Sequence, residues 1–462
     1  MNLQVRKSLS LSFVCYLIVL ALLPLALAWD GGNYFNGSFI DSSPDNQLKS
    51  KVWLRNNVNL KDKGEIYGLD SLQVKWQADL GSNWGYPMNQ PIIADIDNDG
   101  VIEIVVSDFK GDTSHTFIHC FNGENGTEEW VTTDHRYMSY RRLTAFDIDL
   151  DGTMEIFGSV ATAGAYQGVY CFNHTGGEEW HETTDQAYEV ACFDIDNDSE
   201  IEVIYAGETA LYALNSTGSI EWSCPIPETV SVAIGDLDND GSYEIVTQQY
   251  STSTPNYVIV VNGTGDIIQN ASVPTSKIYI LALDDVDGDN DLEILYYSRF
   301  GTTTENIGLL HHNGTAAWNI STGYDLDIWQ AAMYDVNADG YSEMFLAGKS
   351  SGAGEILSLK GQDGSTRWSH TTTYQSESGV VLADINSDNA LEALFIDRAG
   401  YLFCFNANTG SLLWQYTNVG IIKFNIAVAD VDQDGLAEII FGSGDASGSN
   451  WFRLTVLDEA IP

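Results

Sequence analysis

The chain has 462 residues, with 65 Asp and Glu against 20 Lys and Arg, which gives a formal net charge of −45 at pH 7. Nucleic acids and anionic membrane surfaces also carry negative charge, so both are poor partners for such a chain. We therefore expect no nucleic-acid partner.

The beginning of the chain has the features of an export signal. Within residues 1–28, a basic start is followed by an apolar stretch from Phe13 to Leu25 and by ALA at 26–28. This order is typical of a signal peptide cleaved before Trp29, with an uncleaved anchor as the alternative. Residues 29–66, rich in Asn, Asp, Ser and Gly, are interpreted as a leader or linker. We expect a secreted, extracellular protein with no membrane span after cleavage. Association of the secreted protein with the cell surface is the alternative location.

One acidic motif then recurs along the chain. Its first copy, DIDNDGVIE from Asp95 to Glu103, opens like a calcium loop, in which alternate side chains turn toward one centre. An EF-hand has its glutamate at position 12 between helices, whereas here Glu103 is at position 9 between β-branched runs, so the loop is predicted to join two strands. Eight copies start 42 to 52 residues apart. That period predicts a propeller, solenoid or array.

We call each of these nine-residue stretches an acidic loop. All eight have Asp at positions 1 and 5, Asp or Asn at position 3 and Glu at position 9, and these positions are the predicted metal ligands. In the first four loops they are Asp95, Asp97, Asp99, Glu103, Asp147, Asp149, Asp151, Glu155, Asp194, Asp196, Asp198, Glu202, Asp236, Asp238, Asp240 and Glu244. In the last four they are Asp285, Asp287, Asp289, Glu293, Asp335, Asn337, Asp339, Glu343, Asp384, Asn386, Asp388, Glu392, Asp430, Asp432, Asp434 and Glu438.

A second motif alternates with the acidic loops. It consists of a strand, an Asn/Gly turn and a strand ending in Trp, as in LYALNSTGSIEW at Trp222. Each period thus holds four short strands, but only WFRLTVLD at 451–458 follows the last loop, and the strand LQVKW at 72–76 precedes the first. Pairing of these two segments would close a ring. The sequence therefore predicts an all-β, eight-bladed β-propeller with four-stranded blades over 67–462, with an open solenoid as the alternative.

The acidic loops, followed by strands such as EIVV and EIIF, resemble FG-GAP or VCBS repeats, the calcium-bearing blades of integrin α-subunit heads and of many secreted microbial proteins. The resemblance covers about residues 67 to 458. It implies Ca²⁺ in each loop, up to eight ions, and extracellular recognition or adhesion. The chain departs from the pattern at Ser199, Asn290 and Asn389, which replace the glycine at position 6, and at Asn337 and Asn386.

The Trp-ended hairpins also resemble the tryptophan-docking repeats of quinoprotein dehydrogenases, NANTGSLLW being the closest copy. We take from this resemblance the fold alone, because the chain lacks the adjacent cysteine pair expected at many quinone sites. Three cysteines, Cys120, Cys171 and Cys404, instead share one repeat position in an apolar strand and are predicted to be small core residues. Nine N-x-S/T sequons make glycosylation of a secreted chain an expectation, although Asn-Gly-Thr is also a good turn sequence.

One basic and aromatic segment, DHRYMSYRR at 134–142, lies outside the repeat pattern. It precedes the second acidic loop, so it is predicted to enter its blade on the face opposite the loops. Trp84 and Trp329 lie in equivalent entry segments. The predicted ligand-binding residues are His135, Arg136, Tyr137, Tyr140, Arg141, Arg142, Trp84 and Trp329. The alternative is structural, with aromatic rings packed between blades and arginines paired with surface acids.

Three functions are compatible with these features. The favoured hypothesis is a recognition or adhesion module for an extracellular protein or an acidic glycan, because the repeats build a scaffold and no catalytic residues can be assigned. The second is a polysaccharide-active enzyme similar to the eight-bladed, calcium-bound pectic lyases, using His135 and the arginines on uronate carboxylates. The third is a structural cell-surface component.

Overall fold

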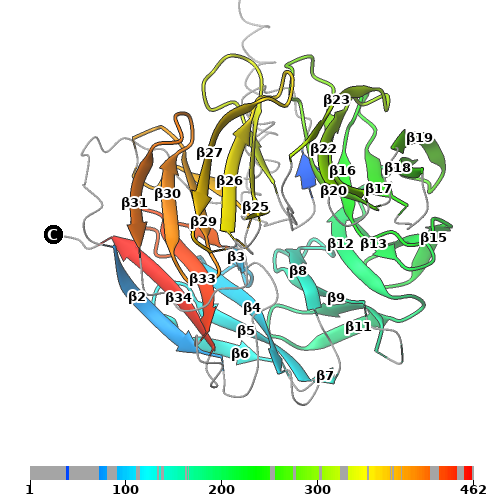
Figure 1. Cartoon of the computed structure of the whole chain (residues 1–462). Coiled ribbons are helices and arrows are strands. Elements are labelled where there is room, and N and C mark those ends of the chain that lie inside the picture. Colours follow the sequence, from blue (N-terminus) through cyan, green and yellow to red (C-terminus); the bar gives the residue numbers. More distant parts are fainter. Residues whose placement is uncertain are drawn as a thin grey trace, which may run out of the picture. The chain divides into compact units, whose positions relative to one another are not determined.

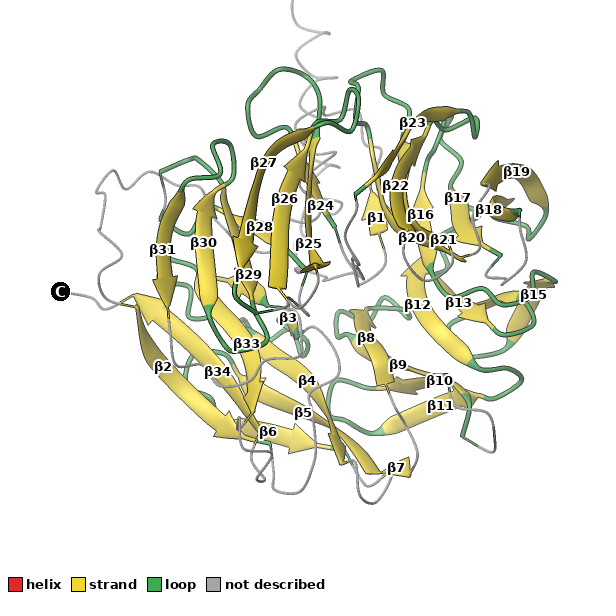
Figure 2. Ribbon diagram, in the orientation of Figure 1, coloured by secondary structure: helices red, strands yellow, loops and turns green. Residues whose placement is uncertain are grey.

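The computed structural model describes residues 38–40, 72–80, 91–110, 115–132, 135–136, 140–161, 164, 166–249, 255–273, 277–300, 304–322, 331–350, 353–374, 376, 379–386, 388–416, 426–444 and 452–459. The predicted signal peptide and most of the predicted leader lie outside these ranges. The described residues form β-strands and loops (Figure 2). None of their segments is a helix of the length and apolar character needed to cross a membrane.

Eight antiparallel sheets form the blades of a ring (Figure 1), and we number each blade by the order of its acidic loop. Blade 1 consists of β3(Ile92–Ala94), β4(Glu103–Lys110), β5(His115–Asn122) and β6(Glu128–Val131), and blade 2 of β8(Tyr140–Phe146), β9(Glu155–Val160), β10(Gly168–Phe172) and β11(Glu178–Glu182). Blade 3 consists of β12(Ala187–Phe193), β13(Glu202–Gly207), β14(Leu211–Leu214) and β15(Ile220–Cys224), and blade 4 of β16(Val232–Gly235), β17(Glu244–Gln248), β18(Asn256–Asn262) and β19(Ile267–Val273). Blade 5 consists of β20(Lys277–Asp284), β21(Glu293–Phe300), β22(Thr304–Leu310) and β23(Ala316–Ser321). Blade 6 consists of β24(Ala332–Tyr334), β25(Glu343–Ser350), β26(Ala353–Leu359) and β27(Thr366–Thr372), and blade 7 of β28(Val381–Ala383), β29(Glu392–Ile396), β30(Leu402–Asn406) and β31(Leu412–Tyr416).

Blade 8 closes the ring by joining a strand that precedes the first acidic loop to the strands around the last one. It consists of β32(Ala427–Ala429), β33(Glu438–Gly444), β34(Phe452–Glu459) and β2(Leu72–Asp79). β2 is the fourth strand and pairs antiparallel with β34, from Leu72 opposite Glu459 to Asp79 opposite Arg453. The predicted eight-bladed propeller and its closure by the terminal strands are therefore confirmed, and the open solenoid is excluded.

Two short strands add to this plan. β1(Ser38–Ile40), within the predicted leader, pairs in parallel with β16, the first strand of blade 4, and β7(His135–Arg136) pairs with β5. The first strand of a blade has one edge without a partner in its own sheet, and β1 supplies the missing hydrogen bonds at blade 4. The leader thus contributes a strand that its polar composition did not predict.

The hydrophobic core lies between the faces of adjacent blades. Second strands such as β9 and β13 are buried along their whole length, whereas fourth strands such as β11 alternate between exposed and half-buried residues. Each core cluster joins two blades: Phe157 of blade 2, for example, packs in one cluster with Tyr205 of blade 3. The five cysteines of the described chain are buried and free, in agreement with the prediction that Cys120, Cys171 and Cys404 act as small core residues.

In six of the eight blades the repeat tryptophan packs on a glycine of the next blade. The indole Nε1 of Trp180 donates to Ser216 O of blade 3 at 3.0 Å, and Trp76 donates to Gly123 O at 2.8 Å. In blade 4, which has no tryptophan, Gln269 Nε2 donates to His312 O of blade 5 at 3.1 Å. The ring of Trp180 lies against Gly218, where an added Cβ would approach its Cε3 to 2.5 Å. Fourth strands therefore dock on the hairpin turn of the following blade in every blade except blade 7. The blade after it, blade 8, has no such turn because its third and fourth strands come from distant parts of the chain, and Trp414 Nε1 has no hydrogen-bond partner among the described residues.

We expect Gly218→Ala to lower the free energy of unfolding by about 2–4 kcal/mol, because the methyl group collides with Trp180 and the residue has a φ of +79°. Gly241→Ala is the matched control, since Gly241 has a φ of +91° and no atom within 4 Å of an added Cβ. That variant should lose only about 1–2 kcal/mol, the cost of the left-handed conformation. Equal losses in urea denaturation would contradict the docking role of the tryptophan.

Candidate metal centres

The acidic loops fold through hydrogen bonds from their own backbone. In blade 1, Asp95 at position 1 accepts the N–H groups of Asp99 and Gly100, each at 3.0 Å, and Asp99 accepts that of Val101 at 2.8 Å. Positions 4 and 6 have positive φ, 60° at Asn98 and 91° at Gly100. These contacts bend the chain into a tight turn that directs the carboxylates of positions 1, 3 and 5 to one side.

Replacing the glycine at position 6 keeps the positive φ of that position. Ser199, Asn290 and Asn389 have φ values of 75°, 78° and 66°. Their N–H groups still bind the Asp at position 1, as Ser199 does to Asp194 Oδ2 at 3.0 Å. Three loops thus keep a left-handed backbone at position 6 with a residue for which this conformation is less favourable than for glycine.

The glutamate at position 9 is buried at the start of the second strand. In all eight loops its Oε2 accepts the backbone N–H of position 2, at distances from 2.7 to 3.2 Å. Glu103, Glu293 and Glu438 are at most 1% exposed. One carboxylate oxygen is therefore held by the backbone, and the other is left for a ligand or a neighbouring side chain.

Ligand atoms converge in these loops. In blade 1, carboxylate oxygens of Asp95, Asp97 and Asp99 lie within 4.8 Å of one another, and in blade 2 the same holds for Asp147, Asp149 and Glu155. Blades 3 and 4 contain equivalent groups with Glu202 and Glu244. A donor set made only of oxygen suits a hard cation, and a loop of several carboxylates suits Ca²⁺. The residues of these four blades therefore fit the predicted ion.

The carboxylates of each loop lie close together and some of them are buried, so their negative charges favour a nearby cation. Burial, together with the negative charges of the aspartates in the same loop, raises the pKa of Glu103, Glu155 and Glu202 to about 8. Burial also raises the pKa of Glu244, to about 7. Ionised carboxylates are thus unfavourable in the folded chain unless a cation offsets them.

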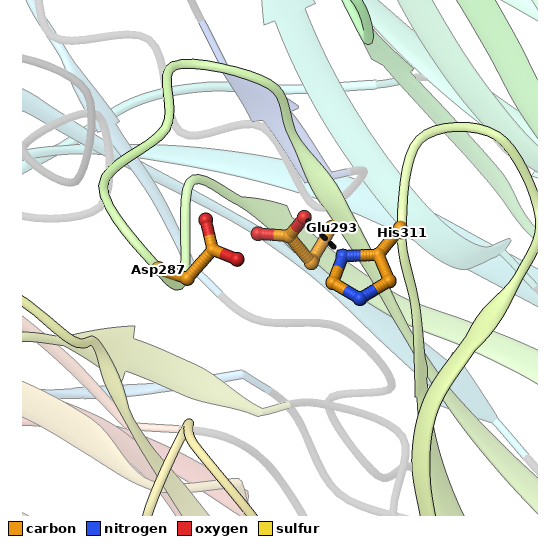
Figure 3. A group of neighbouring side chains, drawn as sticks. All are labelled: Asp287, Glu293 and His311. Carbon is orange, nitrogen blue, oxygen red and sulfur yellow. Dashed lines mark hydrogen bonds and ion pairs between the residues drawn. The ribbon is translucent and has the colours of Figure 1, made fainter.

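Blade 5 adds nitrogen to the donor set. Figure 3 shows Asp287, Glu293 and His311 gathered at its loop, with His311 Nδ1 3.2 Å from Glu293 Oε1. His311 stands at the hairpin-turn position that Asn occupies in several other blades. Beside it, His312 Nδ1 lies 3.0 Å from Asp291. The sequence prediction missed both histidines because it considered the acidic loop without the neighbouring hairpin.

Side chains from the fourth strands also reach the loops. In blade 8, Lys75 of β2 contacts Asp432, and in blade 6, Arg367 Nε lies 3.5 Å from Glu343 Oε1. Neither residue was among the predicted sites. The signal that would have found them is their place in the repeat, since each directly precedes a docking tryptophan.

The predicted ligand-binding segment is described in part. His135 and Arg136 form β7, where they pair with Thr116 and His115 of blade 1. The residues at 140–142 begin β8, at the end of the strand opposite the acidic loop, and the register shifts between Tyr140 and Leu143. Trp84, Tyr137 and Trp329 lie outside the described residues. The structure thus places the backbone of His135, Arg136, Tyr140, Arg141 and Arg142 and does not test their role.

Comparisons with known proteins place the chain by its fold. No protein-family model and no curated protein matches it. Among solved structures, it is similar to the Dos1 propeller, with a TM-score of 0.57, 10% identity, and coverage of 83% of this chain and 95% of the other. The fold is a β-propeller. It is also similar to Saccharomyces cerevisiae Sqt1 (TM-score 0.55, 12% identity, 85% and 100% covered) and to the computationally designed Ika8 protein (0.51, 14%, 81% and 98%). At such identities the likeness concerns the fold alone.

We expect Ser199→Gly to raise the free energy of unfolding by about 0.5–1 kcal/mol, since glycine adopts a φ of 75° without the penalty that serine pays. Ser199→Ala should leave the free energy of unfolding unchanged, because a positive φ is as unfavourable for alanine as for serine. Thermal unfolding of both variants checks this. A gain in the alanine variant equal to that in the glycine variant would show that backbone conformation is not the cause.

Proposed function

We propose that this protein is a calcium-loaded, secreted or cell-surface propeller that acts as a recognition or adhesion module. The observation that carries the metal part is the buried glutamate of each acidic loop, which has one oxygen bound by the backbone and shares its loop with other carboxylates. The similarity of the loops to FG-GAP and VCBS repeats supports Ca²⁺ as the ion.

Calcium in these loops would stabilise the ring as well as the single blade. Ligands at positions 1 and 9 belong to the ends of the first and second strands, so the ion would hold the two strands together. Neighbouring loops are already joined by the backbone: Met154 N donates to Ile96 O of the preceding blade at 2.8 Å, and Ser342 N to Val286 O at 3.0 Å. An ion that fixes one loop therefore also fixes the loop beside it.

The repetition of the site favours binding over catalysis. A pair of catalytic carboxylates needs two unlike environments that separate their pKa values. Here burial raises the pKa of the position 9 glutamate in blade after blade, to about 8 in Glu155, Glu202 and Glu392 alike. We infer that the metal sites are structural, and that the partner, an extracellular protein or an acidic glycan, binds elsewhere, at the segment 134–142.

Removal of calcium should destabilise the protein. A site held at 100 times its Kd contributes about 2.7 kcal/mol, and the contributions of several such sites add, so chelation with EDTA should lower the melting temperature by more than about 10 °C. Calorimetry with and without calcium, together with metal analysis of both samples, measures this. A metal-free sample with the same melting temperature as the calcium-loaded sample would contradict the proposal.

Glu202→Gln should selectively reduce the stabilisation that calcium gives. The amide oxygen can still accept the N–H of Ile195, which donates to Glu202 at 2.8 Å, but the anionic ligand is lost. We expect the difference in stability between calcium and EDTA to shrink by about 2–3 kcal/mol. Glu200→Gln in the same loop, at an exposed position, is the control and should leave this difference nearly unchanged.

Recognition can be tested at the basic segment. Arginine matches carboxylate geometry, so Arg136→Ala combined with Arg141→Ala should abolish binding to the acidic glycan or protein found in a calcium-containing binding screen of the mature chain. Melting temperature and calcium content should stay near wild type, and Thr217→Ser in a hairpin turn should change neither binding nor stability. Unchanged binding in the double variant would move the partner site elsewhere on the propeller.

A further inference from the structure

In blades 6 and 8 the residue before the docking tryptophan contacts the acidic loop of its own blade. In blades 1 to 3 this residue is a glutamate, Glu129, Glu179 or Glu221. In blade 1, Asn122 Nδ2 of the hairpin donates to Glu129 Oε1 at 3.3 Å. By its place in the repeat, this glutamate of the fourth strand adds a carboxylate beside the acidic loop in each of these three blades.

In blade 8 the equivalent residue is a lysine that lies among the carboxylates. Lys75 Nζ donates to Asp432 Oδ2 and, at 3.1 Å, to Asp458 Oδ2, and it lies 3.7 Å from Glu438 Oε1. The side chain of Glu438 is 0% exposed, and its Oε1 has no hydrogen-bond partner among the described residues. The ammonium group is thus the positive charge nearest to the oxygen that would otherwise bind a metal ion.

Blade 6 has an arginine at the same place. Arg367 Nε lies 3.5 Å from Glu343 Oε1, and both side chains are largely buried, at 13% and 1% exposure. The loop has also lost one carboxylate, because Asn337 stands at position 3 and donates its Nδ2 to the same Glu343 oxygen at 2.7 Å. Blade 6 therefore combines a lower ligand charge with a guanidinium beside its buried acid.

We propose that Lys75 and Arg367 are built-in cations that take the place of the metal ion in blades 8 and 6, so that these two acidic loops do not load with calcium. This inference rests on calcium binding by the other loops. Lys75 contacts the ligand oxygen of position 3 and approaches that of position 9, so an ion would have to displace it from both. Affinity in carboxylate loops rises with ligand charge, so blades 1 to 3, with their additional glutamate, bind calcium most tightly.

The placement of Lys75 suits the position of blade 8 in the ring. Lys75 lies on β2, whereas Asp432 and Asp458 belong to the other end of the chain. A side-chain cation is always present at this site, whereas a free ion dissociates when its concentration falls. The pairing of the two terminal strands is therefore held by charge in both the calcium-loaded and the calcium-free protein.

The number of bound ions tests the proposal. At saturating calcium, metal analysis of the desalted mature chain should find about six ions. Asp97→Asn in blade 1 should weaken one of the measured sites at least about tenfold, while the equivalent Asp432→Asn in blade 8 should leave all of them unchanged. Eight ions in the wild-type chain, or a lost site in Asp432→Asn, would overturn the proposal. The absence of any bound calcium would instead refute the proposed metal-binding function itself.

A charge exchange tests the same point in both directions. Lys75→Glu gives blade 8 the pattern of blades 1 to 3 and should add about one calcium ion, with a melting temperature that is lower than wild type in EDTA and recovers in calcium. Glu129→Lys should remove about one ion and keep the fold in EDTA. If Lys75→Glu does not fold without calcium, it is prepared in calcium and counted there. Unchanged ion numbers in both variants would show that the residue before the tryptophan does not control loading.

Discussion

A buried carboxylate at the start of the second strand is the constraint that every blade has to satisfy. The backbone N–H of position 2 binds one oxygen of this glutamate in each blade, but a single hydrogen bond does not offset the cost of burying a charge. Different blades meet the remaining cost differently. Blades 1 to 4 offer a convergent oxygen cluster for an ion, blade 8 places Lys75 beside Glu438, and in blade 7 Asn386 Nδ2 lies 3.5 Å from Glu392 Oε1. The same local fold therefore tolerates several sources of compensating charge or hydrogen bonding.

The ring could be predicted from the sequence because its information is local and repeated. The spacing of the acidic loops gives the number of blades, and the last loop is accompanied by only three strands, which leaves a fourth place that the strand at 72–79 fills. The loop conformation was also readable in most copies, although Ser199 shows that the glycine of the motif can be replaced without a change of backbone. Local patterns thus contained both the topology and most of the candidate ligands.

The side chains that complete the sites could not be predicted in this way, because their contacts form only when the ring closes. Lys75 and Asp432 are 357 positions apart in the sequence, and no motif connects them. His311 was overlooked for a related reason: it belongs to the hairpin, which was interpreted as a turn element and not as part of the loop site. β1 gave no signal either, since a three-residue strand that adds to an existing sheet edge needs no hydrophobic pattern of its own.

The pairing of β2 with β34 has a mechanical consequence. Leu72 and Glu459 are opposite each other, so tension applied through these two residues enters the strand pair at one and the same end. Hydrogen bonds loaded in this geometry break one after another, as in a zipper, whereas bonds between strands pulled lengthwise in opposite directions share the load. Lys75, three residues along β2, holds Asp458 close to the point where such peeling would begin. A force applied at Leu72 and Glu459 would therefore have to break the ion pair between Lys75 and Asp458 among the first contacts of the strand pair, before the other blades come under load.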